Sequence, residues 1–160
     1  MNQNQELIET FYSAFANQDA EGMRSCYHPE VVFQDPAFGI LKGKDAADMW
    51  EMLIKRSNGN LKIEFFDILA NKERGSSRWV ATYIFSKTGR KVVNEIQAQF
   101  EFKDGLIIRH TDYFNIWNWT KQAMGLSGWL LGWTGFMQNK IQQAALLSLR
   151  KYQEKQSEIN

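Results

Sequence analysis

Apolar residues in the first third of the chain recur every three or four positions, which is the spacing of amphipathic helices. Between the second and third of these segments, Val31 to Phe33 predicts a brief strand that ends at the turn Gln34-Asp35-Pro36. Residues 38–43 are expected to form a loop. The three expected helices cover residues 6–16, 20–26 and 45–56.

The spacing changes to strand-like alternation between residues 61 and 114, where β-branched and aromatic residues are frequent. Helices followed by a run of strands predict an α+β fold with a largely antiparallel sheet, one face of which the helices cover. Short polar turns divide the stretch into four expected strands, at residues 61–70, 78–85, 92–102 and 106–114.

Two titratable residues, His110 and Asp112, lie on the apolar face of the last expected strand. The loop before this strand sets its pairing. A two-residue Asp-Gly loop places Phe100 opposite Arg109, whereas a three-residue loop with a left-handed glycine places Phe100 opposite Ile108. The second register keeps the apolar faces continuous, so it is the one predicted here.

In this register both titratable side chains and Asn94 face the same apolar side. Titratable groups on an apolar surface need partners, and such settings are typical of functional sites. The alternative is a hydrogen-bonded pair that only fixes the strand in place. The opposed residues would be Ala98 and His110, Ile96 and Asp112, and Asn94 and Phe114.

From Ile116 onward the pattern is helical again, with a break at residues 125–128. A last amphipathic helix is expected at about residues 136–155, and its apolar stripe needs a packing partner because isolated helices are marginal in water. We therefore expect a domain of residues 1–118 and a helical extension of residues 119–160, packed on the same domain or on a partner subunit.

A net charge of +1 gives no electrostatic reason to expect nucleic acid or an anionic membrane as a partner. The single Cys26 excludes an internal disulfide, and the first residues lack the pattern of a signal peptide, so a cytoplasmic location is expected. The two histidines lie far apart in sequence, and neither a metal nor a cofactor is expected.

Four segments occur in a recognisable order: Asn17 to Asp19, Tyr27 to Pro36, Gly43 before a helix, and Asp104 to Phe114. Over about residues 5–118 the chain thereby resembles the nuclear-transport-factor-2-like superfamily, and most of all its SnoaL-like proteins and ketosteroid isomerases. The resemblance implies a bent sheet wrapped by helices into a cone, open at one end onto an apolar pocket. Because this fold carries many reactions, it does not name one.

Compared with ketosteroid isomerases, Asp35 falls where those enzymes carry their proton-shuttling aspartate, and Trp50 where they have a pocket aromatic. Asp35 could also be an ordinary turn residue. The two oxyanion-hole positions fall on Phe11 and Ala98, and Tyr12 lies about 100 degrees around the helix. Without both donors, ketosteroid isomerisation is not expected.

His110 and Asp112 reproduce the His-x-Asp pattern of SnoaL-type polyketide cyclases, whose aspartate is an acid/base. The run from Asp112 to Phe114 also matches limonene-epoxide-hydrolase-like members. Those hydrolases need an Arg-x-Asp partner on the neighbouring strand, where this chain has Asn94 and Ile96, so their triad is not visible.

We therefore expect a small cofactor-free enzyme that transfers protons on a lipophilic molecule, by isomerisation, aldol-type cyclisation or dehydration. Asp112 is the preferred general acid/base, His110 orients it, and Asp35 is a second base. The rivals are an assembly module filled by its own aromatics and a sensor that only holds an apolar ligand. A homodimer through the polar outer face of the sheet is also expected. The residues expected to contact the ligand are Asn94, Trp50, Tyr12, Ala98, Phe100 and Phe114.

Overall fold

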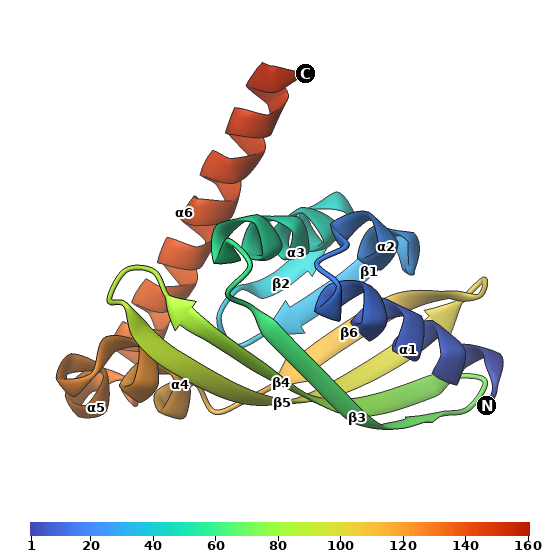
Figure 1. Cartoon of the computed structure of the whole chain (residues 1–160), viewed down its shortest axis with the longest axis horizontal. Coiled ribbons are helices and arrows are strands. Elements are labelled where there is room, and N and C mark those ends of the chain that lie inside the picture. The colour runs from blue at the N-terminus through green and yellow to red at the C-terminus, as the bar shows by residue number, and fades with distance from the viewer.

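The structure, a computed structural model, describes residues 1–160 as a curved six-stranded sheet with helices across one face (Figure 1). The strand order is β2-β1-β6-β5-β4-β3, and all neighbours are antiparallel except β1 and β6. This confirms the predicted α+β class. The elements are α1 (Gln3–Ala16), α2 (Ala20–Ser25), β1 (Tyr27–Asp35), β2 (Gly39–Lys42), α3 (Lys44–Ser57), β3 (Lys62–Ala70), β4 (Arg74–Phe85), β5 (Arg90–Lys103), β6 (Leu106–Tyr113), α4 (Ile116–Met124), α5 (Leu126–Leu131) and α6 (Gly135–Ile159).

The first helix starts earlier than expected because Asn2 and Gln5 form a capping box. Helices α1 and α3 then bring aromatic side chains onto the inner face of the sheet, and one continuous apolar core results. Within it lie the buried rings of Phe11, Tyr12, Phe15, Phe33, Trp50, Trp79 and Phe100.

Residues 39–42 form strand β2 rather than the expected loop, so that prediction was wrong. The strand pairs with β1, with Phe33 opposite Leu41 and Asp35 opposite Gly39. Its four residues are too few to show a hydrophobic period, and only Leu41 is buried. Strand β4 also begins earlier than predicted, at Arg74, because its polar first residues pair with both β3 and β5.

The predicted register between β5 and β6 was wrong by two residues. Lys103 pairs with Leu106, so the loop is the two-residue Asp104-Gly105 turn, in which both residues have positive φ. A β-bulge follows: Phe102 pairs with Ile107, but Glu101 pairs with Arg109. Because of the extra residue, Ile107, His110 and Asp112 are all buried. Strict alternation would instead place Ile107 on the opposite face from His110 and Asp112. The resulting cross-strand pairs are Phe100 with His110 and Ala98 with Asp112.

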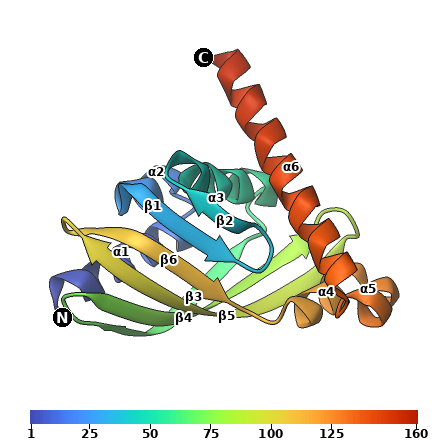
Figure 2. The same ribbon diagram turned by 180° about the vertical axis from the view of Figure 1, so that it is seen from behind.

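The C-terminal extension forms three helices at the end of the sheet farthest from the N-terminus (Figure 2). Helix α6 packs on α3 through the buried Leu149, and Gln153 donates hydrogen bonds to Asp45 at 2.8 Å and to Asp48 at 2.9 Å. Helices α4 and α5 approach closely at Gly128, where any β-carbon would collide with the Thr120 carbonyl oxygen. No helix is long and apolar enough to cross a membrane.

Candidate active site

A chain of buried hydrogen bonds runs through the core from helix α3 to strand β4. The Trp50 indole N–H donates to the Tyr27 hydroxyl oxygen at 2.8 Å, and that hydroxyl lies 2.8 Å from His110 Nδ1. His110 Nε2 lies 2.9 Å from Asp112 Oδ1, and the Trp79 indole N–H donates to the same oxygen at 3.3 Å. The sequence thus brings together residues from α3, β1, β6 and β4.

One assignment of protons satisfies every member of this chain. An indole N–H can only donate, so the Tyr27 oxygen accepts from Trp50 and its own proton points to His110 Nδ1. His110 then carries its proton on Nε2 and donates it to Asp112. Aromatic rings fix the imidazole in place: Phe100 and Phe33 have ring centroids 4.5 and 5.2 Å away, and Trp50 stacks on it at 5.9 Å.

On the same side of the core as Asp112, the buried hydroxyls of Tyr12 and Ser77 have no hydrogen-bond partner of ordinary geometry, although Ser77 interacts with the Tyr12 phenol strongly enough to lower its pKa. Ser77 lies opposite Ala98 on the neighbouring strand, and Ala98 lies opposite Asp112, so the three residues form a row across the inner face. Both protein donors to Asp112 reach Oδ1, which leaves Oδ2 available. An unpaired buried hydroxyl costs about 1–3 kcal/mol, so such groups indicate a place for another polar atom.

The electrostatics of this row favour a neutral Tyr12. Burial raises its pKa well above the ordinary value, and the negative charge of Asp112 raises it further, whereas a hydrogen bond with the Ser77 hydroxyl lowers it. Burial likewise raises the pKa of Tyr27, with the Trp50 hydrogen bond acting the other way. Both phenols therefore keep their protons at neutral pH and act as donors.

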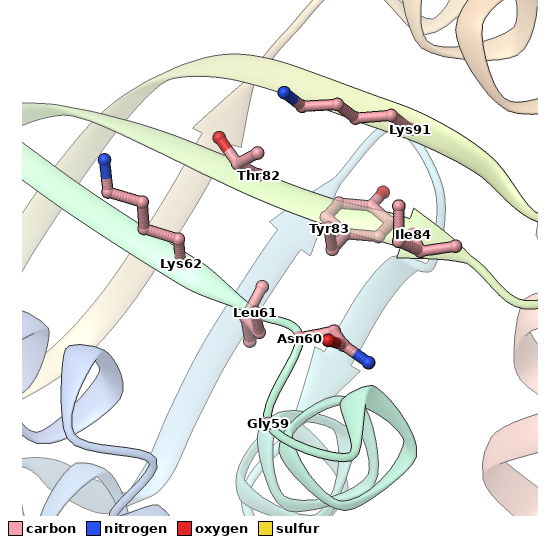
Figure 3. A pocket seen from close by; sticks show the side chains of 8 residues that line it. All are labelled: Gly59, Asn60, Leu61, Lys62, Thr82, Tyr83, Ile84 and Lys91. Carbon is pink, nitrogen blue, oxygen red and sulfur yellow. The ribbon is translucent and has the colours of Figure 1, made fainter.

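The interior around these groups is closed. His110 is 0% exposed and Asp112 is 3% exposed. A cleft of about 280 Å³ lies at the ends of β3 and β4, lined by Asn60, Leu61 and Tyr83 among others (Figure 3). A second cleft, of about 820 Å³, lies on the outer face and includes Arg109 and Tyr113. Neither cleft is lined by His110 or Asp112.

Asp35 stands apart from this chain, half-buried where β1 ends. Its pKa is raised to about 7, mainly by burial and also by the charge of Asp112, whereas hydrogen bonds from the backbone N–H groups of Phe38 and Ala37 act in the opposite direction. Burial raises the pKa of Tyr83, and the Asp35 charge raises it further, whereas a hydrogen bond from Trp119 lowers it. Asp35 is thus coupled electrostatically both to the interior and to Tyr83 of the Figure 3 cleft.

The remaining predicted residues divide between the interior and its edge. Trp50, Ala98 and Phe100 are buried around the hydrogen-bonded chain, whereas Phe114 and Asn94 are half-buried. Asn94 lies opposite Ala81 on β4. In the corrected register it is four residues along β5 from Ala98, the residue that pairs with Asp112. It does not lie opposite Phe114 as predicted.

Three residues of the site were not predicted: Tyr27, Ser77 and Trp79. Tyr27 lies in one of the segments that carry the family resemblance, but the strand that positions it begins four residues earlier than its sequence predicts. Ser77 lies just before the strand predicted at residues 78–85, although β4 already includes it. Ser77, Trp79 and Ala81 are alternate residues, and all three are buried. This alternation was the signal from which Ser77 and Trp79 could have been predicted to lie on the inner face of a strand. No group of three or more His, Cys, Asp or Glu lies close enough to hold a metal ion.

Comparisons with known proteins agree with this fold. The model of the SnoaL-like domain matches residues 8–110, and the chain therefore belongs to the SnoaL-like domain family. No curated protein matches the chain. Several solved structures are also similar, and at identities of 10–23% they establish the fold alone.

A candidate polyketide cyclase from Xanthomonas campestris has 23% identity and a TM-score of 0.61, with 75% of this chain and 96% of that chain covered. An epoxide hydrolase of the limonene-epoxide-hydrolase-like type from M. tuberculosis has 21% identity and a TM-score of 0.60, with 80% and 95% covered. A Catenulispora acidiphila protein with a ketosteroid-isomerase-like fold, in complex with trimethylamine, has 10% identity and a TM-score of 0.61, with 74% and 92% covered.

Proposed function

We propose that this protein is an enzyme that transfers protons on a lipophilic carbonyl compound, with Asp112 as the general base and Tyr12 as the donor to the substrate oxygen. The observation that carries the proposal is the row of unpaired polar atoms beside Asp112: the buried hydroxyls of Tyr12 and Ser77 and the free Oδ2. Membership of the SnoaL-like family, with a candidate polyketide cyclase among its structural neighbours, supports a small-molecule substrate.

In this mechanism Asp112 Oδ2 removes a proton from the carbon next to the substrate carbonyl. The carbonyl oxygen gains negative charge and accepts a hydrogen bond from Tyr12, which is protonated at neutral pH because burial raises its pKa. His110 and Trp79 hold the carboxylate through Oδ1. Asp112 then returns the proton to a different atom of the enolate, which gives isomerisation, or the enolate attacks a second carbonyl and the proton goes to the alkoxide that forms there, which gives cyclisation.

In this proposal Asp35 is the second general acid/base. A carboxyl group with a pKa of about 7 exchanges protons readily at neutral pH, which suits a general acid/base. Its coupling to both Asp112 and Tyr83 supports a position between the interior and the Figure 3 cleft, from which it exchanges protons with solvent. Because the interior is closed, substrate entry requires the aromatic side chains that cover Tyr12 to move.

Exchange of carbon-bound protons tests this chemistry without the natural substrate. Lipophilic cyclic ketones are incubated in D₂O, and loss of the proton signal next to the carbonyl is followed by NMR. The intact protein should accelerate exchange, Asp112→Asn should abolish the acceleration, and Tyr12→Phe should reduce it about a hundredfold. Asp104→Asn is the matched control, because it makes the same change in an exposed turn.

Equal exchange rates in the intact protein and Asp112→Asn would overturn the proposal, provided that far-UV circular dichroism shows both to be folded. The amide keeps the size of the side chain but cannot accept a proton at neutral pH. A rate that depends on Asp35→Asn but not on Asp112→Asn would move the general base to Asp35 and leave Asp112 a structural role.

A second candidate function is a non-catalytic assembly module of the same fold, and the closed, aromatic interior favours it. In that case Tyr12→Phe should only stabilise the protein, because it removes an unpaired buried hydroxyl. Urea unfolding distinguishes the two: a gain in stability with no ketone exchange in any variant supports the assembly module.

We also propose a cytoplasmic homodimer formed through the outer face of the sheet. The outer residues Gln99, Arg109, Thr111 and Tyr113 line the 820 Å³ cleft, and the Tyr113 side chain is half exposed. A mixed polar and aromatic surface suits a self-complementary interface. Sedimentation velocity tests it: Tyr113→Lys should convert a dimer to an 18.7 kDa monomer, and a wild-type protein that is already monomeric at micromolar concentration contradicts it.

A further inference from the structure

The net charge of +1 conceals a strong asymmetry along the chain. Residues 116–153 contain four basic residues, Lys121, Lys140, Arg150 and Lys151, and not one Asp or Glu. The other residues carry fifteen basic and eighteen acidic side chains, so they are negative overall. The C-terminal helices therefore form the positive part of the molecule.

The same helices expose the largest apolar side chains of the protein. Trp129 is 57% exposed, Trp133 is 64% exposed and Phe136 is 71% exposed, and Leu126, Leu130 and Leu131 are also at least half exposed. All six lie within eleven consecutive residues that span α5 and the start of α6. We call these six residues the α5 patch. It lies at the extremity of the molecule, opposite the N-terminus (Figures 1 and 2).

Basic side chains lie on or next to the helices that carry the α5 patch. The Lys140 ammonium lies 4.8 Å from the ring centroid of Phe136, and the Lys121 ammonium lies 4.3 Å from that of Trp117. The Arg90 guanidinium donates to the Gln122 carbonyl at 2.8 Å and lies against Gly125, at the start of α5. The patch is thus apolar and aromatic at its centre, with cations at its edge.

We propose that the α5 patch binds an anionic lipid surface, with its Trp, Leu and Phe side chains at the boundary of headgroups and acyl chains. Exposed Trp, Phe and Leu beside Lys and Arg are the features of segments that lie in a membrane interface without crossing it. Anionic lipids attract each nearby Lys or Arg. The net charge of the whole chain gave no reason to expect a membrane, but the local composition of this surface does.

A second copy of the chain is the other occupant to consider, and charge disfavours it. In a two-fold symmetric contact the patch of one copy meets the same patch of the other. Lys121, Lys140 and Arg90 would then approach their own counterparts, with no carboxylate from residues 116–153 to offset them. An anionic lipid surface offers the same apolar burial with charges of opposite sign.

Co-sedimentation with lipid vesicles tests this proposal on the full chain. Vesicles of phosphatidylcholine are compared with vesicles of phosphatidylcholine and phosphatidylserine, at low and high salt. The protein should bind the anionic vesicles and dissociate at high salt. Lys121→Gln with Lys140→Gln should weaken binding about tenfold or more, and so should Trp129→Ser with Trp133→Ser. Leu69→Ser, an exposed apolar residue on β3, should leave binding unchanged.

Absence of binding to both kinds of vesicle would overturn the proposal, and so would equal binding to both, since that excludes the role of the cations. Sedimentation velocity without lipid distinguishes the second copy: an oligomer that the Trp129 and Trp133 substitutions dissociate shows that another chain covers the patch. All substituted side chains are at least partly exposed, and circular dichroism verifies that the variants fold.

Discussion

Aromatic residues fill the interior of the cone and also cover the C-terminal helices, but the two regions use them in opposite ways. In the interior, Trp50 and Trp79 are buried, and each indole N–H donates to a member of the hydrogen-bonded chain. In the α5 patch, Trp133 is exposed and its N–H donates only to the Leu130 carbonyl oxygen within its own turn. We propose that the first region serves chemistry and the second serves contact with a partner surface.

Charge separates the two regions as well. The interior holds Asp112, whose negative charge raises the pKa of Tyr12, Tyr27 and Asp35. The C-terminal helices hold only cations up to residue 153. Substitutions in the interior should therefore change stability and pH dependence, whereas those in the extension should act through helix packing or surface binding.

The largest expected effect is on the interior chain. His110→Ala removes a ring packed between Phe33 and Phe100 and leaves Tyr27 and Asp112 without their shared partner. The free energy of unfolding should fall by about 3 kcal/mol or more, measured by urea denaturation. His28→Ala is the control, because its side chain makes only a local hydrogen bond with the Glu30 N–H and a 3.5 Å contact with the exposed Asp104 carboxylate, and it should cost less than about 1 kcal/mol. Equal effects of the two substitutions would show that the chain does not stabilise the core.

The next effect concerns pH. The pKa of Asp35 is raised to about 7 in the folded protein, from an ordinary value near 4, so the folded state disfavours its ionisation. Its ionisation therefore destabilises the folded state: the penalty is absent below about pH 4 and grows as the pH rises to about 7. A pKa shift of three units corresponds to a free energy of about 4 kcal/mol. Because solvent screens the charge of a half-buried group, we expect a penalty of roughly 2 kcal/mol.

Asp35→Asn tests this sign. The amide oxygen can still accept from the Ala37 and Phe38 N–H groups but carries no charge. The variant should match the wild type in stability at pH 4 and exceed it by roughly 2 kcal/mol at pH 8. Urea denaturation at the two pH values measures the difference, and parallel pH profiles for the two proteins would refute the raised pKa.

The smallest expected effect lies in the extension. Gly128→Ala places a methyl group against the Thr120 carbonyl oxygen and should destabilise the packing of α4 on α5 by roughly 1–3 kcal/mol. Gly135→Ala, with open space around it, should be neutral or stabilising by up to about 1 kcal/mol. Thermal unfolding followed by circular dichroism compares them, and a neutral Gly128→Ala would mean that α5 moves independently of α4.

Much of the fold followed from the sequence because hydrophobic period marks each long element. Apart from strand β2, the order of helices and strands and the largely antiparallel sheet were predicted and confirmed. The β5–β6 register was not, because turn chemistry and hydrophobic pattern favoured different pairings. The structure satisfies both with a two-residue Asp104-Gly105 turn and a bulge near Ile108, and a bulge has no sequence period of its own.

Strand alternation alone placed only the residues that a single strand carries, whereas Trp50 and Tyr12 were expected from the family resemblance. His110 and Asp112 lie two residues apart on β6, so strand alternation alone placed them together. Tyr27, Ser77 and Trp79 reach them from other strands, across pairings that the sequence left open. The exposure of the α5 patch was also hidden, because an apolar stripe at helical spacing looks the same whether it packs inside or remains outside.

The most direct test of the proposed interior site is a crystal structure of the protein with a lipophilic phenol, whose oxygen resembles that of an enolate. The phenol oxygen should lie within hydrogen-bonding distance of the Tyr12 hydroxyl and Asp112 Oδ2, with the covering aromatic side chains displaced. A phenol that binds only at the surface, with the Tyr12 and Ser77 hydroxyls still unpaired and the interior still closed, would contradict the proposed chemistry.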